Sequence, residues 1–364
     1  MVPLAWAFRC MGDEVLVATA VEAFGGTVTQ AGLPVSVVSR AIGPEEYPRV
    51  SAAGLPGDPL EAGLAASGRG WGALAARAVK DMGELVDSYL PDLVISEPGE
   101  FAGRIAAAER GLPWVEHSWA LPFPPGYTAA AGSSLSTELS RLGLADLPAP
   151  VATVHPSPPS LWPDAEADAI AMRYVPYNGQ AVFSDRNFVK SASPRVLITF
   201  GSLQLKYGDG QVSTLVTELV ERLTGIGCEL VLGMDGALVP GLRPLPAGVL
   251  HVGWTPLNLV LADCDLVIHH GGSGTSMTAA AFGLPQLTLP QATDQFITSG
   301  RLAAHGTAIR LEPERCSSAQ CLDAAVRLLD DPSYRTGARA LARELADLPS
   351  PAAVAEGLRR RVAI

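Results

Sequence analysis

The sequence predicts an α/β protein built from two doubly wound, Rossmann-like domains with a cleft between them. Two observations lead to this prediction. Apolar runs of strand length alternate with helical stretches throughout the second half of the chain, and the same rhythm recurs less regularly in the first half. Continuous apolar strands between helices are typical of a parallel sheet that is covered on both faces. The chain has 364 residues, which is enough for two such domains.

The second half contains the clearer pattern. Helical stretches at 211–226 and 275–283 separate several of its strand-like runs. The runs are apolar along their whole length, as buried parallel strands are, and lie at 194–202, 228–236, 248–254, 264–270 and 285–290. We therefore expect a parallel-sheet domain over residues 194–345.

The first half predicts a second domain of the same class, over residues 1–172, followed by a proline-rich linker at 173–193. Helical patterns occupy 1–11, 71–90 and 100–110, and strand-like runs lie at 13–19, 33–38, 91–97 and 112–118. The first of these elements is a helix, whereas a right-handed β-α-β unit needs a parallel strand before that helix. We therefore expect that residues precede Met1 and that the first strand is missing from this numbering.

Composition excludes several classes of function. The net charge of −11 leaves no basic stripe with which to neutralise nucleic-acid phosphates. No run approaches the roughly 20 apolar residues of a membrane span. The five cysteines form neither CxxC pairs nor a Cys/His cluster, so we expect free thiols in a protein of the reducing cytoplasm.

A glycine-rich loop follows the strand-like run that ends at His269 and His270. The sequence GGSGT places Gly272, Ser273, Gly274 and Thr275 at the carboxyl end of the sheet, where ligands of α/β proteins bind. The helix that follows offers free N–H groups and a positive dipole end, which suit a pyrophosphate. A plain strand-to-helix turn is the alternative. Met277 stands where the third glycine of a dinucleotide fingerprint would be, which disfavours a nicotinamide cofactor.

Other strand ends of the second half carry residues that suit a nucleotide sugar. A small hydroxyl residue, Ser202, ends one run, and Trp254 with Thr255 follows another. An aromatic ring can stack on a base, and the pair Asp294 and Gln295 can bind sugar hydroxyls. Alone, Trp254 would more often be a core residue and Asp294 a solvated turn.

These motifs resemble the donor half of family 1 glycosyltransferases of the two-Rossmann-domain (GT-B) type. The resemblance rests on WTPL, HHGGSGT and DQ in this order, and it is strongest for actinomycete enzymes that attach deoxysugars to polyketide antibiotics. MRYVPYNG at 172–179, SPPSL at 157–161 and the first 19 residues are also typical of that group. The resemblance covers essentially the whole chain.

The resemblance implies roles for individual residues. His269 would donate to the diphosphate, Trp254 and Thr255 would recognise the base, and His270 is assigned to packing because strand side chains alternate. The amphipathic segment 346–364 would return to the first domain. The implied donor site comprises Ser202, Trp254, Thr255, His269, Gly272, Ser273, Gly274, Thr275, Asp294 and Gln295.

The acceptor side is less well defined. In the resembling family the catalytic base is a histidine that would here precede Met1, so the candidates inside the numbering are Glu97 and His117, with Glu116 as an alternative to His117. Trp119, Phe123 and Tyr127 are expected to line an aglycone pocket, although a surface loop pinned by its aromatic residues is equally compatible.

No metal is expected, although Asp263-Cys264-Asp265 has the D-x-D form of a metal-binding transferase. The motif precedes its strand and therefore lies at the edge opposite the glycine-rich loop, so we interpret it as a solvated turn and strand start. In a C-glycosyltransferase relative an aspartate follows the equivalent of Trp119. Ala120 stands there in this chain, which favours O-transfer.

The function expected from the sequence is therefore inverting, metal-independent transfer of a deoxysugar from a dTDP-sugar to an aromatic or macrolide polyketide aglycone. Three alternatives stay open. They are C-transfer to an aromatic polyketide, a nucleotide-sugar epimerase of the same architecture, and a catalytically silent partner that binds the nucleotide sugar or activates another transferase. Neither nucleic acid nor a membrane is an expected partner, and a homodimer is an open alternative to a monomer.

Overall fold

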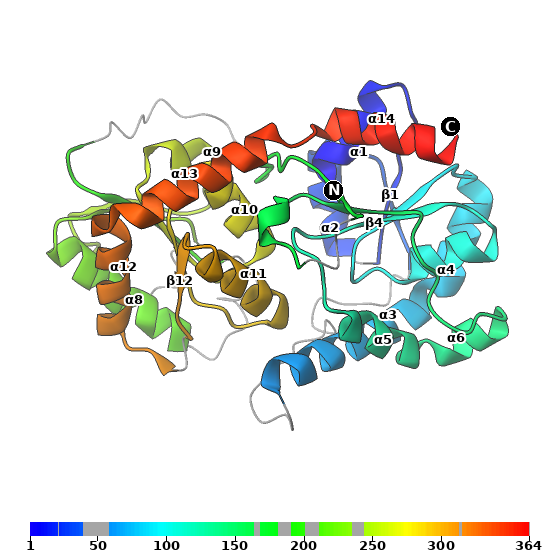
Figure 1. The fold of residues 1–364 in the computed structure, drawn as a ribbon, viewed down its shortest axis with the longest axis horizontal. Helices are drawn as coiled ribbons and strands as arrows, with labels where there is room; N and C mark the ends of the chain where they lie inside the picture. Colours follow the sequence, from blue (N-terminus) through cyan, green and yellow to red (C-terminus); the bar gives the residue numbers. More distant parts are fainter. Residues whose placement is uncertain are drawn as a thin grey trace. The chain divides into compact units, whose positions relative to one another are not determined.

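The computed structural model describes residues 1–20, 22–38, 58–163, 168–180, 191–200, 211–234, 244–312 and 315–363. The chain divides into two compact units (Figure 1), of which the first combines Met1–Arg173 with Leu348–Ile364 and the second is Tyr174–Asp347. Both units are α/β with parallel strands, which confirms the predicted fold class. One boundary differs from the prediction, because residues 174–180 of the expected linker belong to the second unit.

The second unit has a six-stranded parallel sheet in the order β12-β11-β10-β7-β8-β9. Its strands are β7 (Arg195–Thr199), β8 (Glu229–Leu232), β9 (Val249–Val252), β10 (Leu266–His269), β11 (Gln286–Thr288) and β12 (Ala308–Arg310). This is the doubly wound order, in which the direction of winding reverses between β7 and β10. Ligands of such sheets bind beyond the carboxyl ends of the strands at this switch point. β12 was not predicted.

Side-chain alternation along the strands builds two cores, one on each face of this sheet. Val196 and Ile198 pack with α8 (Gln211–Gly225) and α12 (Ser318–Asp330). Leu197 and Val267 face the other side, where α9 (Leu257–Val260), the short helix η6 (Leu261–Asp263) and α10 (Ser273–Ala281) pack. Helices α11 (Thr293–Ala304) and α13 (Pro332–Asp347) complete the unit. His269 has the same parity as Val267, so the alternation directs its side chain toward α10.

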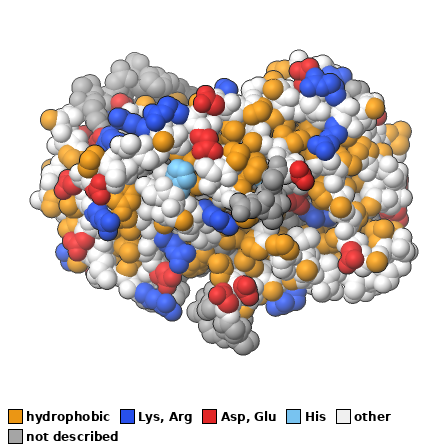
Figure 2. Space-filling model, in the orientation of Figure 1, with side chains coloured by type: hydrophobic (Ala, Val, Ile, Leu, Met, Phe, Trp, Pro, Cys, Tyr) orange, Lys and Arg blue, Asp and Glu red, His pale blue; other side chains and the backbone are white. Residues whose placement is uncertain are grey.

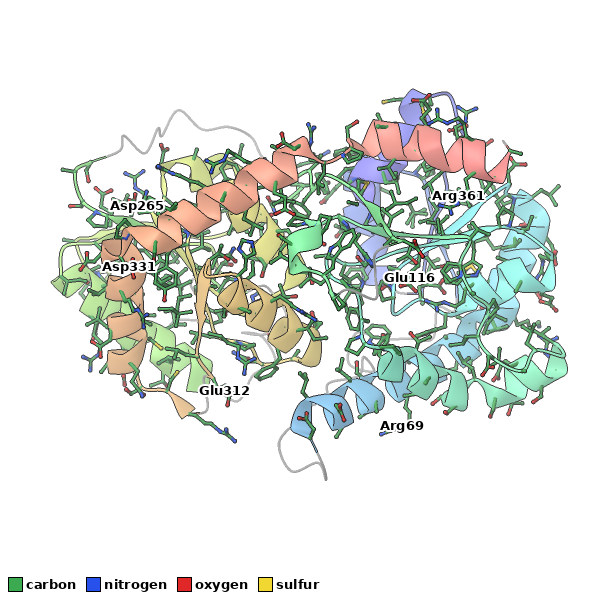
Figure 3. All side chains as sticks on the ribbon, viewed as in Figure 1. Arg69, Glu116, Asp265, Glu312, Asp331 and Arg361 are labelled. Atoms are coloured by element: carbon green, nitrogen blue, oxygen red, sulfur yellow. The ribbon has the colours of Figure 1, made fainter. Side chains whose placement is uncertain are left out.

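The opposite edge of the sheet is fastened by two partly buried ion pairs. Arg195 is only 1% exposed, and its guanidinium donates to Glu229 Oε2 at 3.0 and 2.8 Å. Asp265, labelled in Figure 3, accepts from the backbone N–H of Arg195 at 2.9 Å and from Arg335 of α13 at 3.1 Å. The second aspartate of the D-x-D motif is therefore an anchor between β7 and α13, which corrects its interpretation as part of a solvated turn.

The first unit contains two parallel sheets in the described part of the chain, β1-β2 and β3-β4-β5-β6. The strands at 152–155 and 170–171 were not predicted, because the prolines between them, within residues 156–163, interrupt the apolar pattern. The strands are β1 (Val17–Thr19), β2 (Val35–Val37), β3 (Val94–Ser96), β4 (Trp114–His117), β5 (Ala152–His155) and β6 (Ile170–Ala171). The carboxyl ends of β3 and β4 carry the candidate catalytic residues.

Helices cover the larger of these sheets. α1 (Val2–Cys10) and α14 (Pro351–Val362) pack with Val115 and Val154 in one core. A second core gathers side chains of four other helices, α3 (Pro59–Tyr89), α4 (Ala102–Glu109), α5 (Pro125–Ser134) and α6 (Ser136–Arg141). Two short helices, α2 (Glu22–Gln30) and η2 (Pro159–Leu161), lie between strands in the chain.

Helix α3 approaches α5 closely because two glycines face it. A Cβ at Gly68 would lie 2.2 Å from the carbonyl oxygen of Tyr127, and a Cβ at Gly72 would lie 2.6 Å from that of Ala131. No side chain fits at such distances, so this stretch of α3 requires glycine. The contact fixes α5, which carries Tyr127, one of the three aromatic residues predicted to face the acceptor.

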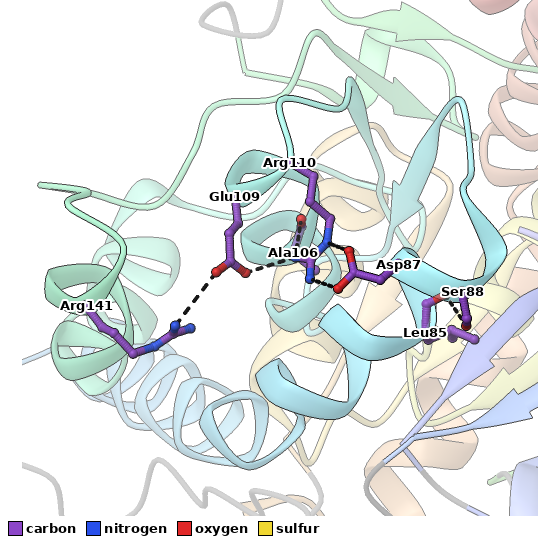
Figure 4. A network of polar contacts seen from close by, with 7 residues as sticks. All are labelled: Leu85, Asp87, Ser88, Ala106, Glu109, Arg110 and Arg141. Atoms are coloured by element: carbon purple, nitrogen blue, oxygen red, sulfur yellow. Dashed lines mark hydrogen bonds and ion pairs between the residues drawn. The ribbon is translucent and has the colours of Figure 1, made fainter.

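A polar network fastens the end of α3 to α4 (Figure 4). The guanidinium of Arg110 holds both carboxylate oxygens of Asp87, at 2.6 and 2.7 Å, and its third nitrogen donates to the Ala106 carbonyl at 3.1 Å. Glu109 joins Arg110 at 2.9 Å and Arg141 at 3.7 Å. A bidentate pair fixes orientation as well as distance, so the network ties the C-terminal end of α4 to the C-terminal end of α3.

The surface carries charges of both signs. On the face drawn in Figure 2, Lys and Arg side chains are interspersed with Asp and Glu side chains rather than gathered into a basic patch. Among the described helices, none is both long enough and apolar enough to span a membrane. Cys228 and Cys264 are buried free thiols, as predicted.

Candidate functional site

The glycine-rich loop lies at the switch point of the second unit, between β10 and α10. Gly272 is the N-cap of α10 and has no side chain with which to cap the helix. The first backbone bond of the helix runs from the Ser276 N–H to the Gly272 carbonyl at 2.9 Å. The N–H groups of Ser273, Gly274 and Thr275 thus lack intrahelical partners and carry the positive end of the helix dipole. Since Gly274 is exposed and its two neighbours are partly exposed, an anion can reach these donors.

The loop geometry depends on Gly271. Its φ of +82° lies in the left-handed region, which L side chains rarely adopt. A Cβ at this position would also lie 2.3 Å from Ser299 Oγ in α11. Both constraints exclude other residues, so this glycine turns the chain sharply between the strand and the helix.

His269 stands inside the protein beneath the loop. Its ring is 0% exposed, Nδ1 accepts from the Gly271 N–H at 3.0 Å, and Nε2 lies 2.9 Å from Gln286 Oε1. Because Nδ1 accepts, the proton is on Nε2, which donates to Gln286. Burial lowers the pKa of His269 to about 3, so the ring is neutral. This differs from the predicted donation to a diphosphate, since both ring nitrogens already have protein partners.

Gln286 extends this chain of bonds to α10. Its side-chain amide donates to the Ser276 carbonyl at 3.2 Å. His269 and Gln286 therefore link the loop, β10, β11 and α10. We conclude that His269 holds the loop in place rather than contacting a ligand.

His270, predicted to serve packing, is the histidine that lies against the loop. A Cβ at Gly272 would come within 2.3 Å of His270 Nε2. Burial lowers the pKa of His270 to about 4, while a backbone hydrogen bond at Thr199 raises it. Its Nδ1 is a buried atom without a hydrogen-bond partner among the described residues. The structure thus gives both ring nitrogens of His269 protein partners and places the His270 ring beside Gly272.

Trp254 follows β9, which is the third strand along the sheet from β10. The end of β9 therefore lies about 14 Å from the end of β10, where the glycine-rich loop begins. Its side chain is 72% exposed, which is unusual for a tryptophan and leaves a ring face open for stacking. The absence of a side chain at Gly179 leaves room for the Trp254 ring, because a Cβ at Gly179 would lie 3.3 Å from Trp254 Cζ2. The hydroxyl of Thr255 donates to the Gly253 carbonyl at 3.1 Å and so stabilises the turn.

Asp294 and Gln295 lie in the first turn of α11, beyond the carboxyl end of β11. Burial raises the pKa of Asp294 to about 6, although the backbone N–H groups of both residues oppose that rise. The side-chain oxygen of Gln295 accepts from the backbone N–H groups of Gln291 at 2.9 Å and Ala292 at 3.2 Å. This oxygen caps the helix, so a ligand would use the amide NH2 group instead.

Ser202 lies outside the described residues. Among the residues that the structure describes, no group of three or more His, Cys, Asp and Glu side chains is arranged to hold a metal ion.

In the first unit, Glu97 follows β3 in a setting suited to a base. Its Oε2 accepts from the Gly99 N–H at 2.8 Å and from the indole N–H of Trp119. Burial, with a further contribution from the charge of Glu100, raises the pKa of Glu97 to about 7 against these hydrogen bonds. A carboxyl with a pKa near neutrality can accept a proton and release it again at physiological pH.

Two tryptophan rings, those of Trp119 and Trp71, lie near this carboxyl. Trp119 stacks edge-to-face on Phe123 at 5.0 Å between ring centroids. Trp71 approaches from α3, since a Cβ at Gly99 would lie 3.3 Å from both Glu97 Oε1 and Trp71 Cδ2. Trp119 and Phe123 are partly exposed, as an acceptor-lining pair must be. Tyr127 is not, because it is 1% exposed in the helical core, which corrects its predicted place in the pocket.

The other candidate bases are engaged elsewhere. Glu116, labelled in Figure 3, pairs with the buried Arg104 at 3.1 Å. His117 is 2% exposed, its Nδ1 lies 2.8 Å from the Ser118 carbonyl, and burial lowers its pKa to about 3. A base that neither reaches solvent nor accepts a proton near neutral pH is poorly suited to catalysis, so the geometry argues against the prediction for His117.

Residues of the expected linker were missed as site residues. The hydroxyl of Tyr174 donates to the Gly274 carbonyl at 2.9 Å, and Asn178 reaches α9 and α10. The sequence YVPYNG stands out by its composition, but nothing in its pattern shows that it contacts a loop 100 residues away.

The chain matches two family models one after the other. Residues 6–201 match the erythromycin biosynthesis protein CIII-like N-terminal domain, and residues 217–360 match the corresponding C-terminal domain. The chain belongs to the CIII-like family. This CIII-like chain is 40% identical to L-demethylnoviosyl transferase of Streptomyces niveus, over 98% of this chain and 93% of the relative. It is 31% identical to 10-deoxymethynolide desosaminyltransferase of Streptomyces venezuelae, over 100% and 94% of the two chains.

Solved structures give the same result. Glycosyltransferase SsfS6 of Streptomyces sp. SF2575, complexed with thymidine diphosphate, superposes with a TM-score of 0.84 at 34% identity over 99% of this chain and 95% of that one. Spinosyn rhamnosyltransferase SpnG, also complexed with thymidine diphosphate, gives 0.86 at 28% identity over the same shares. The CIII-like chain is therefore a glycosyltransferase of the GT-B type.

Proposed function

We propose that this CIII-like chain transfers a deoxysugar from a dTDP-sugar to a hydroxyl group of a polyketide aglycone, with inversion at the anomeric carbon and without a metal ion. The observation that carries the proposal is the uncapped N-terminus of α10, with three backbone donors at the switch point of the sheet. The names of the relatives support a sugar transfer of this kind, since they specify demethylnoviosyl and desosaminyl groups and, in one case, 10-deoxymethynolide as the acceptor. The thymidine diphosphate complexes support the nucleotide.

The donor would lie along the carboxyl edge of the second sheet. The N–H groups of residues 273–275 would bind the diphosphate, and the exposed ring of Trp254 would stack on the thymine. Asp294 and the amide NH2 of Gln295 would bind the hydroxyl groups of the sugar.

Leaving-group stabilisation would come from the loop itself. As the bond between the anomeric carbon and the phosphate oxygen breaks, its electron pair moves to the diphosphate, and the fixed N–H groups of α10 stabilise that charge without a metal. His269 would contribute by holding the Gly271 N–H in place. His270 is the histidine beside this loop and is neutral at pH 7.

The acceptor would bind to the first unit. Glu97 would take the proton of the acceptor hydroxyl while the acceptor oxygen forms the new bond to the anomeric carbon. Trp119 and Phe123 would form an apolar wall for the aglycone. The cysteines of the described residues are free thiols, which is consistent with an enzyme that acts in the reducing cytoplasm, where nucleotide sugars are made.

The test is a transfer reaction with a dTDP-deoxysugar and a panel of aromatic and macrolide aglycones in the presence of EDTA, with the products identified by mass spectrometry. The expected product is the aglycone plus one sugar, formed at the same rate with and without EDTA. Donor binding without transfer to any member of the panel would contradict the enzymatic proposal, and a requirement for added metal would contradict the mechanism.

A further inference from the structure

Residues 174–179 form a strap across the donor edge of the second unit. At one end, the Tyr174 hydroxyl donates to the Gly274 carbonyl at 2.9 Å and lies 3.1 Å from Thr278 Oγ1. The hydroxyl of Thr278 itself donates to the same carbonyl at 2.7 Å. Gly274 is the central residue of the anion-binding turn, so the strap contacts this turn directly.

The other end of the strap reaches the turn that carries Trp254. The side-chain oxygen of Asn178 accepts from the Asn258 N–H at 3.2 Å, which satisfies a free donor in the first turn of α9. Its amide nitrogen lies 3.5 Å from Thr278 Oγ1 on α10. The next residue, Gly179, has a φ of +89° and leaves room for the Trp254 ring. One side chain thus bridges the first turn of α9 and the helix of the anion site.

The Tyr174 bond also acts on the anion donors. The Gly274 carbonyl belongs to the same peptide unit as the Thr275 N–H. A hydrogen bond to this carbonyl polarises the peptide and makes its N–H a stronger donor, because hydrogen bonds in series reinforce one another. Thr278 is fully buried and Tyr174 is partly buried, so water competes little for these bonds.

We propose that Tyr174 and Asn178 are positioning residues, which fix the base-binding turn at 254–258 relative to the anion-binding turn at 272–275. This proposal rests on the proposed function and deepens it. The two turns follow strands that are three positions apart in the sheet, and the strap is the described segment that joins them across the gap by side-chain bonds. Its effect is to set the length of ligand that can occupy both sites together.

A fixed spacing benefits only a ligand that occupies both sites. When base and diphosphate are joined, binding of one half places the other at high effective concentration, provided that the two sites are held at the matching distance. Thymidine or pyrophosphate alone gains nothing from the spacing. Loosening the strap should therefore weaken binding of dTDP more than it weakens binding of either part.

The experiment compares Tyr174→Phe and Asn178→Ala with the wild type and with Val175→Ala, a control at an exposed side chain of the same strap. Dissociation constants for dTDP are measured by calorimetry, and those for thymidine and pyrophosphate by competition, in EDTA. We expect each variant to bind dTDP about tenfold more weakly, the loss of one hydrogen bond at the upper end of its range, with thymidine affinity changed less than twofold. Val175→Ala should match the wild type.

Two results would overturn the proposal. One is unchanged dTDP affinity in both variants. The other is an equal loss for dTDP and thymidine, since this would mean general damage to the base-binding turn. Melting temperatures of the same samples show whether each variant is folded, and the ratio of the two affinities does not depend on the folded fraction. Failure of the wild type to bind dTDP would instead contradict the proposed function.

Discussion

Glu97→Gln is expected to change both the pH dependence of stability and the turnover of the enzyme. The pKa of this carboxyl rises from 4.5 to about 7 on folding, chiefly through burial. Between these pH values the folded protein binds more protons than the unfolded chain, so stability falls as pH rises through this window and levels off above about pH 7. At 1.36 kcal/mol per pKa unit, the carboxylate costs the folded state up to roughly 3 kcal/mol at high pH.

The assay is denaturant unfolding of the wild type and Glu97→Gln between pH 4.5 and 9, with Glu84→Gln as the control. Glu84 is an exposed glutamate of α3 that pairs with Lys80 at 3.7 Å. The glutamine variant keeps an oxygen that can accept from Gly99 and Trp119. It should gain stability relative to the wild type as the pH is raised from 4.5 to 9, by up to roughly 3 kcal/mol. A stability difference that is the same at both ends of the pH range would refute the raised pKa.

Turnover is read from the same variant. A general base contributes about 10²- to 10⁴-fold, so kcat should fall at least a hundredfold in Glu97→Gln. In the wild type, kcat/KM should rise as pH increases through about 7, because only the ionised carboxylate accepts a proton. A variant that retains full kcat would remove Glu97 from the mechanism, whatever its effect on stability.

Three further changes test the described contacts. Gly271→Ala forces a Cβ to 2.3 Å from Ser299 Oγ at a φ of +82°. It should therefore lower the free energy of unfolding by about 1 kcal/mol or more and weaken dTDP binding. A variant whose melting temperature and dTDP dissociation constant equal those of the wild type would contradict this. His269→Ala should lower both kcat and the melting temperature, because the ring bonds the loop and Gln286; lost kcat at an unchanged melting temperature would point to direct ligand contact instead. Arg195→Met removes the two charged hydrogen bonds to Glu229 and should cost about 1.5–3 kcal/mol in denaturant unfolding; an unchanged midpoint would rule out a structural role for this ion pair.

The glycine-rich loop could be located from sequence because its signals are local. Apolar strands, a glycine cluster and a helix start occur in one continuous stretch, and alternation showed that His269 and His270 face opposite ways. Which ring approaches the ligand was not predictable. Both faces of a doubly wound sheet are covered by helices, and the choice depends on Gly271 and on Gln286, which is 17 residues further along the chain.

Contacts between distant segments were beyond the sequence pattern. Tyr127 was expected at the acceptor because it follows Trp119 in an aromatic loop, but the glycines of α3 draw its helix into the core. Tyr174 and Asn178 were assigned to a linker because prolines surround them, yet they contact turns 80 to 100 residues away. Asp265 forms hydrogen bonds with both Arg195 and Arg335, each of which lies 70 residues away from it in the sequence.

A crystal structure with bound dTDP would test the central claim, that the uncapped turn of α10 and the ring of Trp254 together hold the donor nucleotide. We expect diphosphate oxygens within hydrogen-bond distance of the N–H groups of residues 273–275, the thymine ring stacked on Trp254, and His269 still bonded to Gly271 and Gln286. A diphosphate held by the His269 ring, or a nucleotide bound away from the α10 turn, would contradict the account.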